Sequence, residues 1–210
     1  MKQLIKLSKG FTLVELIVVI AVLLAVLGTA IGIFISIVQH QRIILAEQEL
    51  LNQTSYVLEY MSKALRMAGK DLTGDCLRDS FGTIYGEYNY LLTRPVNGVY
   101  TGIKFINRSD NDTCQEFYLD STDPENPVLK ETKNGLPATG VALTSDKFMI
   151  NSIRFGINGD NGLTTGVIGA AGDNNIQPRV TVYLDIQVKG DGGSAKKIQT
   201  TISQRNLNVQ

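Results

Sequence analysis

The 210-residue sequence has no tryptophan, a single histidine, two cysteines and no excess of either charge. With His40 as its only histidine, the chain lacks the pieces for a histidine-based triad in the region after residue 70. It has no Cys-x-x-Cys pair of the kind that holds zinc, and no phosphate-binding loop motif. Twenty basic and twenty acidic residues exclude a strongly basic field for nucleic acid. An enzymatic or nucleic-acid-binding function is therefore not expected.

Charge is also missing from one long segment, because no charged residue occurs from Leu16 to Val38. As a helix this run would extend roughly 34 Å, which is enough to cross a bilayer. Lys2, Lys6 and Lys9 precede it, and the positive-inside rule places such a basic end in the cytoplasm. The pattern predicts a single membrane-spanning helix with the rest of the chain exported.

The residues Lys9-Gly10-Phe11-Thr12-Leu13-Val14-Glu15, followed by the apolar run, resemble the start of type IV prepilins and pseudopilins, which carry the class III signal peptide. The resemblance covers about the first 40 residues. It implies that a prepilin peptidase removes residues 1–10 as a leader, cutting between Gly10 and Phe11, and methylates the amine of Phe11. An ordinary secretory signal is cut after its apolar core, whereas this cut would keep the helix. An uncleaved signal anchor is the alternative, but it leaves Gly10, Phe11 and Glu15 unexplained.

Glu15 lies directly before the apolar run, where an acid costs about 2.5–3.5 kcal/mol in lipid. The resemblance implies that Glu15 pairs with the Phe11 amine of a neighbouring subunit and sets the register of assembly. The alternative is a carboxylate that reaches water at the membrane surface and does nothing more.

Gly28 and Gly32 are four residues apart in the apolar helix, a spacing that lets two helices approach closely in lipid. Each glycine also weakens a helix by about 1 kcal/mol relative to alanine. The pair therefore predicts either a helix-packing face or a site of local loosening.

The helix is expected to continue beyond the membrane. From residue 39 to residue 68 there is no proline or glycine, and apolar residues recur at helical spacing, so residues 39–69 are predicted to form an amphipathic continuation. One helix from Phe11 to Ala68 follows, with residues 11–38 in the membrane and Gly69 as its stop.

Residues 70–210 show strand periodicity separated by Gly, Asp, Asn and Pro clusters, which predicts a β-rich head. The clearest hairpin joins Arg179–Lys189 to Lys196–Gln204, with its apolar face on the long helix. The fold class is therefore α+β: a long helix packed on an antiparallel sheet, as in pilins. The other expected strands are Thr83–Tyr90, Gly98–Asn107, Cys114–Asp120, Val128–Thr132, Val141–Leu143 and Met149–Ile157.

Two further features of the head concern bonds and metals. Cys76 and Cys114 are an even pair in the exported part and predict a disulfide, with two free buried thiols as the alternative. Loops rich in Asp, Asn and Gly, among them those at Asp160 and Asp173, offer oxygen ligands for Ca²⁺. These residues are equally typical of turns, and no loop completes a calcium-binding pattern, so no cofactor is assigned.

Residues Met61–Gly69 and Gln199–Asn206 resemble the corresponding ends of W-type minor pilins and pseudopilin J. The expected function is that of a minor pilin or pseudopilin of a type IV pilus, type II secretion or competence machine. It implies other pilins, a prepilin peptidase, an inner-membrane assembly platform and lipid as partners, with the head outside the cytoplasm. The alternative is a membrane-anchored binding protein or adhesin that does not polymerise.

Overall fold

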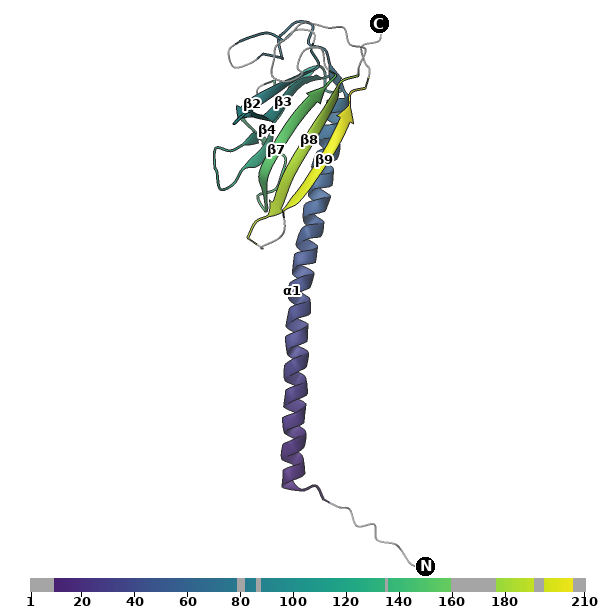
Figure 1. Cartoon of the computed structure of the whole chain (residues 1–210), viewed down its shortest axis with the longest axis vertical. Coiled ribbons are helices and arrows are strands. Elements are labelled where there is room, and N and C mark those ends of the chain that lie inside the picture. The colour runs from purple at the N-terminus through teal and green to yellow at the C-terminus, as the bar shows by residue number, and fades with distance from the viewer. Residues whose placement is uncertain are drawn as a thin grey trace, which may run out of the picture. The chain divides into compact units, whose positions relative to one another are not determined.

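The computed structural model of the chain describes residues 10–78, 82–85, 88–134, 136–159, 177–190 and 195–205, without the side chains of 137–139. One long helix and antiparallel sheets give the α+β architecture predicted from the sequence (Figure 1). The chain divides into two compact units, Met1–Leu45 and Ala46–Gln210, with the boundary inside the helix.

The helix α1 runs from Leu13 to Arg66, two residues shorter at each end than expected. Gly69 is not its stop, because Ala68 and Gly69 form a short strand, β1, that pairs with Asn107 and Ile106. Lys63 and Arg66 lie in the last helical turn, where positive charge is favourable to the helix dipole.

The carbonyls at the end of α1 and just beyond it are satisfied by donors from distant parts of the chain. A helix leaves its last carbonyls without partners inside the helix. Here four consecutive carbonyls, from residue 65 to residue 68, each accept a hydrogen bond from elsewhere in the head. The donors are the Tyr90 hydroxyl to Leu65, the Arg205 N–H to Arg66, the Arg108 N–H to Met67 and the Gln204 amide to Ala68.

Among the described residues, six strands form the first sheet, in which β1 and β2 both pair with β3 and the order continues through β4, β5 and β6. All of the pairs are antiparallel. The strands are β2 Tyr90–Val96, β3 Val99–Asn107, β4 Thr113–Asp120, β5 Val128–Lys133 and β6 Leu136–Ala142.

The second sheet has the order β7-β8-β9, formed by Phe148–Asn158, Arg179–Val188 and Lys196–Ser203 (Figure 1). Its β8–β9 pair is the hairpin predicted from the sequence, with Leu184 opposite Ile198 and Val180 opposite Ile202. The buried residues of β8 share one hydrophobic core with buried residues of α1, as expected. These are Val180, Val182, Leu184 and Ile186 from the strand, and Leu50, Val57, Met61, Ala64 and Leu65 from the helix.

Two of the predicted strands are wrong. No strand covers Thr83–Tyr90; in the described part of that segment, Ile84 forms only an isolated bridge with Arg78, and Tyr90 begins β2 instead. The predicted strand Val141–Leu143 overlaps only the end of β6, which begins at Leu136. The other predicted strands agree with the structure to within one residue at each end.

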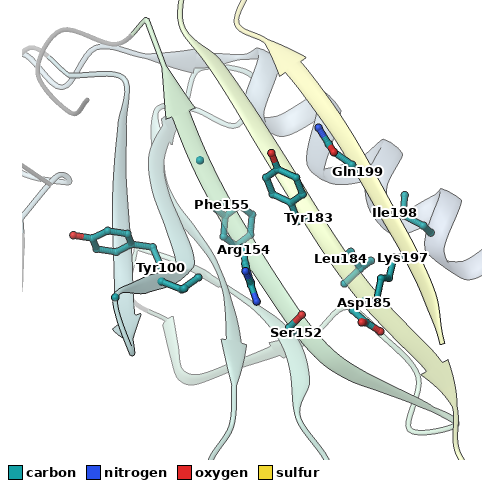
Figure 2. A pocket seen from close by; sticks show the side chains of 13 residues that line it. Tyr100, Ser152, Arg154, Phe155, Tyr183, Leu184, Asp185, Lys197, Ile198 and Gln199 are labelled. Atoms are coloured by element: carbon teal, nitrogen blue, oxygen red, sulfur yellow. The ribbon is translucent and has the colours of Figure 1, made fainter. Parts of the chain in front are cut away.

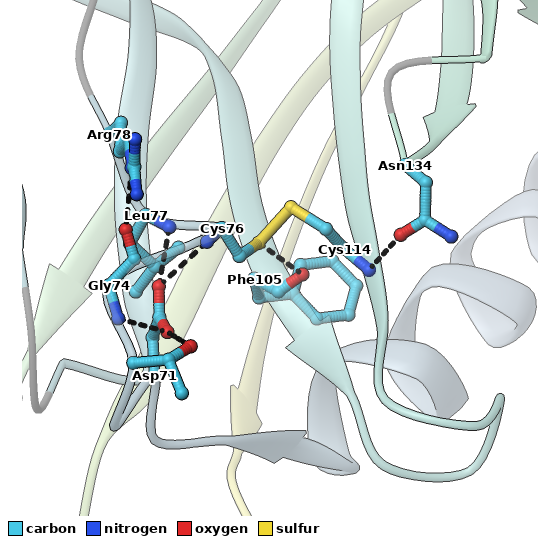
Figure 3. Close-up of a disulfide and its surroundings, with 9 residues drawn as sticks. Asp71, Gly74, Cys76, Leu77, Arg78, Phe105, Cys114 and Asn134 are labelled. Carbon is cyan, nitrogen blue, oxygen red and sulfur yellow. Dashed lines mark hydrogen bonds between the residues drawn. A yellow bond between two sulfur atoms is a disulfide. The ribbon is translucent and has the colours of Figure 1, made fainter. Parts of the chain in front are cut away.

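A second, smaller core lies around the segment from Asp71 to Arg78, which has no strand or helix of its own (Figure 3). The disulfide between Cys76 and Cys114 ties this segment to β4, which confirms the predicted pairing. Leu77, which is fully buried, packs beside it with Tyr85 and Leu91.

The Asp71 carboxylate organises the same segment. It is fully buried and accepts backbone hydrogen bonds from Gly74 at 2.8 Å, Cys76 at 2.9 Å and Leu77 at 2.7 Å (Figure 3). Burial by itself raises the pKa of a carboxyl group, but these three N–H donors outweigh it, and the pKa of Asp71 is lowered from 3.8. The ionised form is therefore the one that the folded head stabilises.

Asp71→Asn should lower the free energy of unfolding by roughly 2 kcal/mol near neutral pH, because an amide NH₂ would face a backbone N–H in a buried site. Since the folded pKa is depressed, the stabilising effect of Asp71 is present above the unfolded pKa and is lost as the pH falls through the folded one. Denaturation of both proteins at pH 7 and below pH 4 tests this. The difference between them should shrink in acid; a difference that is constant with pH would contradict an ionised Asp71.

Candidate functional site

The bond between Gly10 and Phe11 lies outside the helix in an exposed segment. Gly10, Phe11 and Thr12 have no regular secondary structure, and α1 begins at Leu13. The side chain of Phe11 is 82% exposed, and no atom lies within 4 Å of the position that a Cβ on Gly10 would take. A peptidase needs an accessible, non-helical bond, and the predicted cleavage site presents one.

Thr12 caps the start of α1. Its hydroxyl accepts a hydrogen bond from the Glu15 N–H at 3.3 Å, and its carbonyl accepts one from the Leu16 N–H at 3.2 Å. Thr-x-x-Glu has the spacing of a capping box, so this cap is also visible in the sequence. Thr12 therefore fixes where the helix begins and places Glu15 in its first turn.

The carboxylate of Glu15 is exposed and makes no hydrogen bond or ion pair with any residue in the described ranges. An acid in the first helical turn is favoured by the helix dipole by about 0.3–1 kcal/mol. A free amine on Phe11 would lie at the same positive end of the dipole and would need a negative partner. The local geometry thus supplies a carboxylate that is available to such an amine.

Apart from Glu15, Thr29 and Ser36, the helix surface from Leu13 to Ile37 is apolar, and it is exposed on all sides. Its large apolar side chains range from 45% exposed at Ile20 to 73% exposed at Leu13. By length and composition α1 is the one helix in the described residues that qualifies to cross a membrane. Such a surface is not stable in water, so it requires lipid or partner helices.

Gly28 and Gly32 lie on this exposed part of α1, and nothing is within 4 Å of either position where a Cβ would stand. Thr29, beside them, turns its hydroxyl to the carbonyl of Val26 at 2.8 Å. The pair leaves a shallow strip on the helix that a second helix can approach, and its role in packing stays a prediction.

The weak calcium candidates, Asp160 and Asp173, lie outside the described residues. Within the described part of the chain, no group of three or more His, Cys, Asp and Glu side chains is placed to hold a metal ion. His40 is on the exposed surface of α1 and not in the head.

A family model for the prokaryotic N-terminal methylation motif matches residues 5–31. This range includes Gly10, Phe11, Glu15 and most of the apolar run, and it supports a processing signal of the type IV pilin class at this end of the chain. No curated protein and no solved structure matches the chain.

Proposed function

We propose that the chain is a minor pilin or pseudopilin, assembled through α1 into a type IV pilus or a secretion or competence pseudopilus. The observation that carries the proposal is the exposed carboxylate of Glu15, which pairs with no described residue, at the start of an exposed apolar helix and inside the methylation motif. A membrane anchor alone does not need an acid there, whereas a helix that must find its register against other helices does.

In this proposal a prepilin peptidase removes residues 1–10 and methylates Phe11. Before assembly, the helix spans the cytoplasmic membrane once, with the head outside the cytoplasm. An inner-membrane assembly platform moves the subunit into the filament, where Glu15 meets the amine of a neighbouring subunit. The exposed apolar surface of α1 supports this route, because it suits lipid before assembly and partner helices afterwards.

The head is proposed to prime, cap or decorate the filament, which is mechanical work without a catalytic group or a cofactor. The sheets and loops of the head form a larger body than a small major subunit needs, and this favours a subunit present in few copies. The resemblance of Met61–Gly69 and Gln199–Asn206 to W-type minor pilins and pseudopilin J supports the same role.

Glu15→Ala tests the proposal. The substitution removes a charge that costs about 2.5–3.5 kcal/mol in lipid, so the protein should remain in the membrane at least as well as before. Its incorporation into filaments should nevertheless fall at least tenfold, because the amine of the neighbour would lose its partner. Sheared filament and membrane fractions, quantified by immunoblot, measure both effects.

Glu15→Asp should recover part of the incorporation, because it keeps the charge, whereas Glu15→Gln should not. Glu59→Ala removes an exposed acid elsewhere on the same helix and should change nothing. Normal incorporation of the Glu15→Ala protein would sink the pilin proposal and would favour an anchored binding protein that does not polymerise.

A further inference from the structure

The outward face of the second sheet carries a groove (Figure 2). Assembly through α1 gives this groove no role. Cross-strand pairing sets Tyr183 of β8 between Arg154 of β7 and Gln199 of β9. The next row in the same direction along the face is Ser152, Asp185 and Lys197. Directly opposed side chains in a sheet are about 5 Å apart, so each row presents three neighbouring groups to solvent.

The groove has the size of a ligand site. The turn between β2 and β3, with Gly98, and the side chain of Tyr100 border the sheet face and enclose about 640 Å³. Sites for small ligands range from about 300 to 1,000 Å³. Gly156 is next to Arg154 along the outward face of β7 and has nothing within 4 Å of a Cβ position. That end of the groove therefore has no side chain to fill it.

The polar groups of the groove are not used by the protein itself. In the described part of the chain, the side chains of Arg154, Tyr183, Lys197 and Gln199 make no hydrogen bond or ion pair. By contrast, Thr181 and Thr201, one row away, bond to each other at 3.1 Å. Asp185 is held by the Asn151 amide at 2.9 Å. The free donors include two cations against one acid that already has a partner, which favours an anionic ligand.

The shape and chemistry of this face narrow the class of ligand. Tyr183 is 46% exposed and is the one large apolar side chain that β7, β8 and β9 expose in their described residues. A protein partner would normally meet an apolar centre with several buried anchors, which this face lacks. Two cations neutralise about two phosphates, too few for firm nucleic-acid binding by a chain that is acidic once residues 1–10 are removed.

We propose that this groove binds a carboxylated sugar of an acidic oligosaccharide. One ring lies against the face of Tyr183, whose flat surface suits the C–H face of a sugar. The sugar carboxylate meets the planar guanidinium of Arg154, which matches its two oxygens, and Lys197 adds a second positive charge. Gln199, Ser152 and the free oxygen of Asp185 are left for hydroxyl groups. The inference does not depend on filament assembly.

The test is calorimetric titration of the full chain in detergent micelles with oligogalacturonate, oligomannuronate and sialyllactose, each against its neutral counterpart. At least one acidic sugar should bind saturably and at least ten times more tightly than its neutral counterpart. Arg154→Gln should remove that preference, because a charge-assisted pair contributes about tenfold or more. Tyr183→Ala should weaken acidic and neutral sugars alike.

Tyr56→Ala and Arg66→Gln, which change exposed residues of α1, are the matched controls and should leave the titrations unchanged. Circular dichroism confirms that each variant is folded. The proposal is overturned if none of the three acidic sugars binds, if binding survives both groove substitutions, or if a DNA oligonucleotide binds in the groove more tightly than every sugar.

Discussion

Replacing Cys76 and Cys114 together by alanine is expected to lower the free energy of unfolding of the head by about 4 kcal/mol. The disulfide closes a loop with a sequence separation of 38. Closing a loop of this length lowers the conformational entropy of the unfolded chain, which by itself accounts for the expected loss of stability. A typical domain is stable by only about 5–15 kcal/mol, so the loss is a large fraction of the total.

The position of the disulfide makes the loss hard to compensate. The segment from Asp71 to Arg78 has no regular secondary structure, and the small core formed by Cys76, Leu77, Tyr85 and Leu91 is separate from the main one. Without the covalent tie to β4, this core is held by its own packing and by the hydrogen bonds to Asp71.

Urea denaturation of the full chain in micelles, followed by tyrosine fluorescence, measures the effect. Cys114→Ala alone should lose nearly as much as the double variant, since either change opens the loop. The wild-type protein unfolded with a reductant present should match the double variant. A change below about 1 kcal/mol in both experiments would show that the closed loop does not stabilise the head.

Gly10→Val is expected to abolish processing almost completely. Intact-mass spectrometry of the purified protein should show residues 1–10 retained and no added methyl group. The physical reason is local: the Gly10–Phe11 bond lies in an exposed segment before the cap at Thr12, and a branched side chain there blocks the close approach of a peptidase to the backbone.

The chain itself has room for the new side chain, because no atom lies within 4 Å of a Cβ at Gly10. A processing defect would therefore reflect recognition by the peptidase and not misfolding. Gly28→Ala is the matched control: it also adds a Cβ where nothing is near, and it should be cut and methylated normally. A Gly10→Val protein with the mature mass would contradict cleavage at this bond.

Part of the head was predictable because some of its strands, β8 above all, follow the two-residue period. In the β8–β9 hairpin, buried Val180, Val182 and Leu184 alternate with outward Thr181 and Tyr183, so both the strand and its face can be read from the sequence. The disulfide could be predicted because the chain has only two cysteines and both lie in the part expected to be exported. The part of the helix beyond residue 38 follows from a long stretch without proline or glycine.

The strand β2 was missed because its residues break the usual rules. Pro95 lacks a backbone N–H and is tolerated because, among the described strands, β2 pairs with β3 alone. Arg94 has a φ of +53°, which is rare outside glycine and asparagine. Tyr85, in the segment wrongly predicted as a strand, is buried in the small core beside the disulfide. In the sequence, tyrosines that pack beside a disulfide have the same spacing as the apolar residues of a strand. The two cases can be told apart only in the folded structure.

The site was predictable at the level of the motif but not of its geometry. Gly10, Phe11 and Glu15 could be identified by resemblance, whereas the cap at Thr12 required reading Thr-x-x-Glu as a helix start. The groove around Tyr183 joins β3, β7, β8 and β9, so no local sequence pattern indicates it.

The order in which the chain is made limits when the head can fold. Gln204, near the end of the chain, hydrogen bonds to the carbonyl of Ala68 across 136 residues and also to the side chain of Asn89. Contacts so distant in sequence form late, since a long loop must close first. The carbonyls of Arg66 and Ala68 therefore lack their donors until residues 204 and 205 have been made. A chain that is exported during its synthesis would therefore cross the membrane with an unfinished head, which closes only when β9 and Gln204 arrive.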